Sequence, residues 1–182
     1  ELDYYDGRGG VMGMDVYGTK PTSEKGEYFR NNVWWWRPLW DYCEHVAPEL
    51  CAGVSAHYND GDGLDDEKAK ALSKILLETL SDGRCIVYEA QYNLEVSQLP
   101  NEDCNICDKT GIRTDEVGKE HGMDVKALSD DEAIVLGRET GWCNGCNGLG
   151  WKPNWATHYP FSRENVQEFA EFLAESGGFS IC

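Results

Sequence analysis

Two Cys-x-x-Cys pairs constrain this chain more than any other feature. The first pair is Cys104 and Cys107, the second is Cys143 and Cys146, and 35 residues separate the two inner cysteines. Two intervening residues let one turn direct both sulfurs at one metal ion, and two such turns supply the four thiolates of a closed tetrahedral zinc site. The spacing therefore predicts one structural Zn²⁺ ion held by these four cysteines.

Glycines follow both cysteine pairs. The second pair continues as C-x-x-C-x-G-x-G over residues 143–150, whereas the first keeps one glycine, Gly111. Glycine permits a positive φ and a close backbone approach, and its N–H group can donate to a coordinating sulfur. We therefore expect two knuckle loops whose glycines support the thiolates.

Other uses of these cysteines stay open at this stage. An iron–sulfur cluster takes the same ligands, and a single C-x-x-C can be a redox pair or two free thiols. A redox pair belongs in a thioredoxin-like strand–helix context, which neither pair has. His121 or His158 could replace a cysteine as a metal ligand, although histidines that lie at the surface or form hydrogen bonds are more common.

The charge of the chain is strongly acidic. The 182 residues carry 33 Asp+Glu and 16 Lys+Arg, for a formal net charge of −17. Such a surface repels a phosphate backbone, so nucleic-acid binding is unlikely, while cationic partners are favoured. A solvated acidic face is the simplest interpretation. Lys109, Arg113 and Lys152 could still form a local basic patch at the knuckles, which keeps nucleic-acid binding as a second alternative function.

The composition indicates a globular cytoplasmic protein. Hydrophobic residues make up 41% and aromatics 12%, enough for a core. No stretch approaches the roughly 20 apolar residues that span a bilayer, so we expect no membrane association. Residues 1–11 are acidic and Gly-rich, and lack the basic and apolar regions of a signal peptide, so we interpret them as an extension or tag-like segment. In a reducing compartment the cysteines are expected to be metal ligands or free thiols.

Residue periodicity predicts an α+β fold, mainly helical with short strands and one inserted four-cysteine zinc-knuckle module. Residues 12–100 and 158–182 are expected to form the body, and 101–157 the zinc-binding module. Strands are predicted at 14–17 and 179–182. Three helices are predicted in the first part of the chain: one with Pro38 in its first turn, one capped by Asp65 or Asp66, and one over 85–99. A capping box at Ser129 is expected to open a short helix over 134–138, and Ser162 is expected to cap the last helix.

A tryptophan block is the most unusual feature outside the cysteines. It comprises Trp34, Trp35, Trp36, Arg37 and Trp40, preceded by Asn31 and Asn32. Burial in the core is one interpretation, because Trp is largely buried on average. The other is a protein-binding surface, because Trp and Arg dominate interface energetics and the two asparagines would add polar contacts.

A loop over residues 57–64 contains His57, Asp60 and Asp62. It is similar to part of an EF-hand loop, but the first ligand and the final bidentate glutamate are missing, so a Gly-rich turn before a capped helix is the better account. We keep the loop as a weak candidate for ligand binding. The remaining cysteines, Cys43, Cys51, Cys85 and Cys182, are expected to behave as small buried hydrophobes.

Two resemblances to known families add to these patterns. The knuckles resemble the cysteine-rich zinc module of DnaJ-type co-chaperones, although this chain has two such units instead of four and no His-Pro-Asp tripeptide. Co-chaperone function is therefore not implied. Most of the chain also resembles an uncharacterised bacteriophage and prophage family, on the blocks at 12–18, 27–38 and 59–64 together with the knuckles. That resemblance implies an origin in a phage or its bacterial host, and no activity.

These observations favour a non-enzymatic, zinc-stabilised interaction protein, a phage accessory protein that binds a host factor. The alternative is an enzyme or small-ligand binder that uses the loop at 57–62 and the tryptophan block. The sequence holds no catalytic constellation that would decide for it, so enzymatic activity stays undecided, with the balance against it.

Overall fold

The computed structural model describes residues 13–124, 129–136 and 143–182. Residues 1–96 and 158–182 form one compact unit, and residues 97–157 form the second. The architecture is α+β and mainly helical, as the sequence predicts. The segment interpreted as an extension, residues 1–11, lies outside the described residues. Within the described residues, no helix is both long and apolar enough to cross a membrane.

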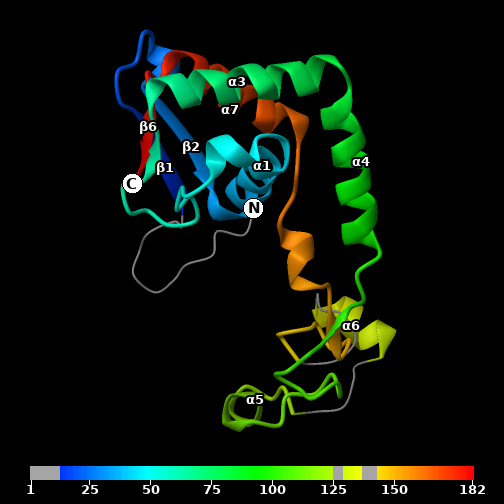
Figure 1. Cartoon of the computed structure of the whole chain (residues 1–182). Helices are drawn as coiled ribbons and strands as arrows, with labels where there is room; N and C mark the ends of the chain where they lie inside the picture. The colour runs from blue at the N-terminus through cyan, green and yellow to red at the C-terminus, as the bar shows by residue number, and fades with distance from the viewer. Residues whose placement is uncertain (1–12, 125–128, 137–142) are drawn as a thin grey trace. The chain divides into compact units, whose positions relative to one another are not determined.

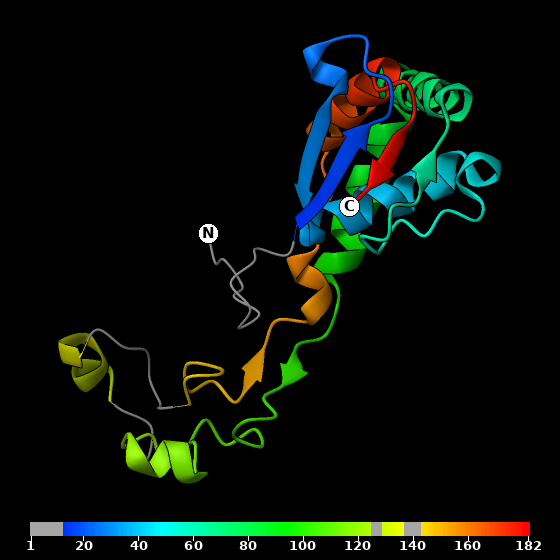
Figure 2. The same ribbon diagram turned by 90° about the vertical axis from the view of Figure 1, so that its left-hand side faces the viewer.

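The first unit contains a four-stranded sheet. Its strands, in spatial order, are β2 (Tyr28–Asn32), β1 (Gly13–Gly18), β6 (Phe179–Ile181) and β3 (Gly63–Leu64), and every neighbouring pair is antiparallel. Figure 2 shows β2, β1 and β6 side by side, so segments from the two ends of the sequence meet in one sheet. The strands predicted at 14–17 and 179–182 are thereby confirmed. Alternate residues such as Val16, Phe29 and Ile181 are buried, as expected of a sheet with one covered face.

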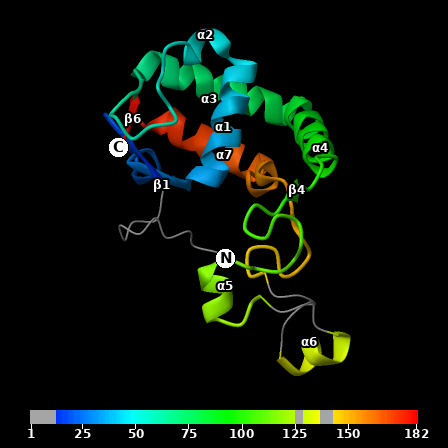
Figure 3. The ribbon, with the colours of Figure 1, turned by 90° about the horizontal axis from the view of Figure 1, so that it is seen from below.

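Helices cover that face of the sheet. The helices described in this unit are α1 (Val33–Val46), α2 (Pro48–Cys51), α3 (Asp66–Ser81), α4 (Arg84–Ser97) and α7 (Arg163–Glu175), with one 3₁₀ turn, η1 (Glu24–Gly26). Of these, α1 and α7 contact the strands directly. Figure 1 shows α3 and α7 running side by side. Ser73 Oγ on α3 donates a buried 2.7 Å hydrogen bond to the Ala170 carbonyl on α7. Helix α1 lies against both (Figure 3).

The start of α1 differs from the prediction, which placed Pro38 in the first turn. The helix begins at Val33, because the Asn32 side chain accepts a 3.1 Å hydrogen bond from the Trp35 N–H and caps it. Pro38 therefore lies inside the helix, where its missing N–H removes one backbone hydrogen bond. The sequence prediction gave too much weight to proline and too little to the asparagine cap.

The other helix predictions are confirmed with small shifts. Asp65 caps α3 and Ser162 caps α7. Helix α4 ends at Ser97, slightly before the predicted end at residue 99. The Ser129 capping box forms as expected, but its helix, α6 (Asp130–Leu136), begins directly after the cap instead of at residue 134. The predicted end at 138 lies outside the described residues.

The second unit has little regular structure. Besides α6 it contains α5 (Glu116–Glu120) and a two-stranded antiparallel sheet of β4 (Glu102–Asp103) and β5 (Trp151–Lys152), and the 3₁₀ turn η2 (Trp155–His158) follows. The strands β4 and β5 lie immediately outside the cysteine pairs. They therefore bring residues 104 and 143–150 together from distant parts of the sequence.

The cap of α3 yields a direct stability test. The Asp65 carboxylate accepts a 2.9 Å hydrogen bond from the Lys68 N–H, so Asp65→Ala should lower the free energy of unfolding by about 1 kcal/mol. Asp65→Asn keeps a capping oxygen and should stay close to the parent protein. Denaturant unfolding of the three proteins makes the comparison; an Asn variant as unstable as the Ala variant would contradict the cap.

Candidate metal centre

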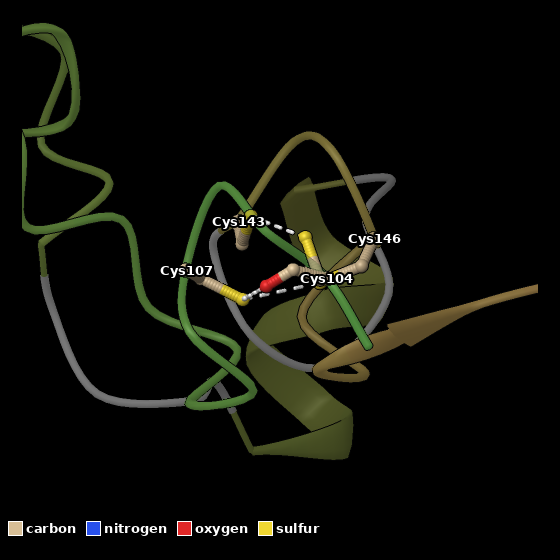
Figure 4. A group of neighbouring side chains, drawn as sticks. All are labelled: Cys104, Cys107, Cys143 and Cys146. Carbon is tan, nitrogen blue, oxygen red and sulfur yellow. Dashed lines mark hydrogen bonds between the residues drawn. The ribbon is translucent and has the colours of Figure 1, made fainter. Parts of the chain in front are cut away.

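The four cysteine sulfurs of the second unit converge on one point. All four lie within 4.8 Å of one another, and Figure 4 shows them directed inward from two separate loops. The Cys104 and Cys143 sulfurs are 3.8 Å apart, and the Cys107 and Cys146 sulfurs are 3.7 Å apart. Four sulfurs at about 2.3 Å from a tetrahedral zinc ion are separated by about 3.8 Å. The group therefore could coordinate a single metal ion.

These cysteines are also the interior of the unit. Their exposed fractions are 0% for Cys104, 5% for Cys107, 0% for Cys143 and 6% for Cys146. Among the described residues of 97–157, no other hydrophobic side chain is buried. Burial of apolar surface normally holds a domain together, and in the described part of this segment the cysteine cluster is the buried hydrophobic group.

The two cysteine loops are structurally equivalent, with a separation of 39 residues. The Cys104 N–H donates to the Gly150 carbonyl at 2.9 Å, and the Cys143 N–H donates to the Gly111 carbonyl at 2.8 Å. Each loop thus uses the last residue of the other as an acceptor. The two loops are cross-linked by reciprocal hydrogen bonds, which fixes the distance between the cysteine pairs.

The predicted role of the glycines is confirmed for these loops. The Gly111 N–H lies 3.3 Å from the Cys107 sulfur, and the Gly150 N–H lies 3.1 Å from the Cys146 sulfur. Their φ angles are +72° and +81°. A Cβ atom on Gly150 would lie 2.3 Å from the Lys109 carbonyl oxygen, so the site requires glycine for both conformation and space.

Sequence reasoning missed how fully the first loop matches the second. Asp108 and Lys109 have φ angles of +47° and +69°, and their counterparts Asn147 and Gly148 have +51° and +79°. The first loop therefore adopts the complete knuckle with a lysine where the second has glycine. Aligning the two C-x-x-C pairs residue by residue, beyond the glycines, is the signal that could have revealed it.

The environment of the thiols favours a thiolate at Cys104. Burial acts to raise its pKa, but hydrogen bonds from the backbone N–H groups of Ile106 and Cys107, together with those from the thiols of Cys107 and Cys146, outweigh burial and lower the pKa to about 7. Burial raises the pKa of Cys143 to about 12. Metal coordination requires the thiolate form of each cysteine ligand, so these hydrogen bonds favour the form of Cys104 that binds a metal.

Neither histidine considered as a substitute ligand belongs to the metal-binding group found among the described residues. Two of the three cations considered as a basic patch for nucleic acid are paired with acidic groups, whereas the third, Lys152, has its Nζ 3.5 Å from the neutral Asn105 Oδ1. Lys109 pairs with Asp103 at 2.7 Å, and Arg113 pairs with Asp115 at 2.9 Å. These cations are bonded to acidic groups of the same unit, which weakens the nucleic-acid alternative.

The tryptophan block divides between core and surface. Trp36 and Trp40 are fully buried, their rings stack with centroids 5.9 Å apart, and Trp36 Nε1 donates to the Ala56 carbonyl at 2.7 Å. The binding-surface hypothesis is therefore wrong for these two residues. Trp34 and Trp35 are half-buried, and Arg37 is exposed.

The two asparagines predicted to supply partner contacts instead serve the fold. Asn31 Nδ2 donates to Asn165 Oδ1 at 2.7 Å, in a largely buried contact between β2 and α7. Asn32 is the cap of α1. Their amides are used inside the unit, so they do not extend the tryptophan block into a binding surface.

The loop at 57–62 uses its carboxylates to hold its own backbone. Asp62 accepts from the Ser55 N–H at 2.6 Å and from the Gly63 N–H at 2.9 Å, which lowers its pKa. Asp60 accepts from the Asp62 N–H. His57 Nε2 lies 3.8 Å from an oxygen of Asp41, outside the loop. This arrangement agrees with a structural turn.

Three of the four remaining cysteines behave as expected. Cys43, Cys51 and Cys85 are buried, and burial raises the pKa of Cys51 to about 12. Cys182 is exposed, so its prediction as a buried residue is wrong. It follows the last residue of β6, where the chain leaves the sheet.

Comparisons with known proteins provide no template for this centre. No family model, curated protein or solved structure matches the chain. The metal centre is therefore judged on its own distances, burial and hydrogen bonds.

The close contact at Gly150 predicts how an alanine at this position affects metal binding. Gly150→Ala should weaken metal binding by at least roughly tenfold, because the new Cβ displaces the Lys109 carbonyl and the loop that carries it. Gly122→Ala is the control: its φ is +66° but its Cβ would meet open space, so only local strain of about 1–2 kcal/mol is added. Competition with a chromophoric chelator measures both. Equal losses would contradict the role of Gly150.

Proposed function

We propose that the four cysteines bind one structural Zn²⁺ ion and that the protein is a zinc-stabilised, non-enzymatic interaction protein. The observation that carries the metal assignment is the burial of four convergent thiols in a unit whose described residues contain no other buried hydrophobic side chain. Zinc bound there would supply the folding free energy that a hydrophobic core supplies elsewhere.

Several features support zinc over the other uses of these cysteines. Sulfur separations of 3.7 and 3.8 Å suit one tetrahedral ion. An iron–sulfur cluster places several irons and sulfides between its cysteine ligands, so the sulfurs of those ligands must lie farther apart than they do around a single ion. A redox pair would act within one C-x-x-C, whereas these two contacts join one pair to the other.

Four protein ligands also leave no open position on the ion, which supports a structural role over a catalytic one. The surface of the unit is where function is then to be expected. Ile106, Leu149 and Trp151 are exposed by 41%, 47% and 42%, and such apolar groups suit contact with another protein. The acidic charge favours a partner of positive charge. A phage accessory role and a location in the bacterial cytoplasm rest on the sequence resemblance and on cysteine usage.

Metal analysis tests the zinc assignment. Protein purified without added metal should contain one zinc per chain. Cys143→Ser should lose the zinc, and hydrogen exchange should then show residues 97–157 unprotected while α3 and α7 keep their protection. Cys182→Ser, which changes an exposed cysteine outside the site, should retain the metal. A reddish-brown preparation containing iron would overturn the assignment.

Partner capture tests the interaction role. Zinc-loaded protein immobilised on a resin should retain a specific protein from a bacterial lysate, and removal of zinc by a chelator should reduce that retention if the second unit contributes to the surface. An acidic protein of similar size and charge serves as the control for non-specific attraction. Failure to retain any specific protein would contradict an interaction role.

A further inference from the structure

The strand β2 is an open edge of the sheet in the first unit. Among the described residues, only β1 pairs with it. The Gly18 N–H donates to the Glu27 carbonyl at 3.0 Å, and hydrogen-bonded pairs alternate along an antiparallel ladder. With Val16 opposite Phe29, the backbone groups of Phe29 face β1. Those of Tyr28 and Arg30 consequently point away from the sheet, ready to pair with an added strand.

A groove runs beside this edge. It has a volume of about 590 Å³ and is bordered by β2, by α7 and by the 3₁₀ turn η1. Its most buried lining residues are Phe29 and Phe172, whose ring centroids are 5.8 Å apart. An edge strand, a facing helix and an apolar floor together form the arrangement that binds extended peptides by strand addition.

The walls of the groove are acidic. Glu24, Glu168 and Glu171 carry three negative charges, against one positive charge on Lys25. The Lys25 ammonium lies 2.5 Å from Glu171 Oε2, and the pKa of Lys25 is raised mainly by this hydrogen bond and charge, with smaller contributions from Glu175 and Glu168. Lys25 thereby neutralises Glu171, while Glu24 and Glu168 make no ion pair among the described residues and give the groove its negative charge.

We propose that this groove binds an extended lysine- or arginine-rich segment of a partner protein, which adds to β2 as a further strand. The proposal rests on the interaction role proposed above and names its surface and the class of partner. Successive side chains of a strand face opposite sides. Those facing the groove can lay their aliphatic stems over Phe29, which is 8% exposed, and reach Glu24 and Glu168 with their charged ends.

Charge also favours a basic segment over a second copy of the chain or a nucleic acid as the occupant of the groove. A second copy of the chain would bring another net charge of −17 to an acidic groove, and a nucleic acid would bring phosphates. Both would be repelled. A basic segment is attracted, and its backbone N–H and C=O groups would satisfy the outward groups of Tyr28 and Arg30.

A designed peptide tests the proposal. The probe is a fluorescein-labelled peptide of about ten residues in which lysine alternates with threonine, and fluorescence anisotropy measures its binding to the full zinc-loaded chain. Two further peptides carry the same sequence with N-methyl groups on the odd or on the even residues. One of them should bind at least roughly tenfold more weakly, because it cannot donate to β2. Equal binding of all three peptides would mean charge attraction alone and would overturn strand addition.

Matched variants locate the site. Glu168→Lys should weaken peptide binding by at least roughly tenfold, because it reverses a charge in the groove. Glu164→Lys changes the net charge equally on the same helix but outside the groove lining, and should change binding by less than about threefold. Equal effects would overturn the assignment, and thermal unfolding of both variants verifies that α7 is intact.

Failure of the groove proposal can be distinguished from failure of the proposed function, because the groove and the metal centre belong to different units. Metal content and partner capture are measured on the same protein samples. If the peptide does not bind while zinc is present and a bacterial protein is captured, the groove assignment is wrong and the interaction role stands. If neither zinc nor a partner is retained, the proposed function falls, whatever the peptide does.

Discussion

The convergence of four cysteine sulfurs is the constraint on which residues 97–157 depend. The described part of this unit contains short helices, a two-stranded sheet and many turns, and its buried hydrophobic side chains are the cysteines alone. The reciprocal hydrogen bonds between the loops bring the sulfurs to tetrahedral spacing. Ordering so many backbone torsions costs conformational entropy that this small interior cannot offset by burial. The four thiols lie close enough together that coordination of one metal ion could compensate for this cost.

The other unit is stabilised in a different way. Its core contains stacked tryptophans, the phenylalanines of α7 and the apolar faces of α3 and the sheet. One hydrogen bond from Trp36 to the Ala56 carbonyl satisfies the indole N–H inside that core, as burial of a tryptophan requires. The candidate metal site and the hydrophobic core therefore belong to different units, so changes at the four clustered cysteines should leave this unit folded.

Local sequence patterns predicted much of the secondary structure. The caps at Asp65 and Ser162, the helical periodicity of α3 and α7, and the strands at both ends of the first unit follow from interactions within a few residues. The errors have the same origin. Pro38 predicts a helix start that the cap at Asn32 in fact determines, and residue type predicts burial for Cys182, which is exposed just beyond the last strand.

The sequence by itself determined the candidate metal ligands, because ligand type, the spacing within each pair and the following glycines are all local properties of the chain. Only the tertiary structure decided which tryptophans are buried, since Trp36 packs against Phe169 of α7 and Trp40 against Phe179 of β6. It also decided that β2 is an edge strand and that Phe29 and Phe172 share one groove. Those facts depend on strand order and on contacts between residues far apart in the sequence, which no local pattern records.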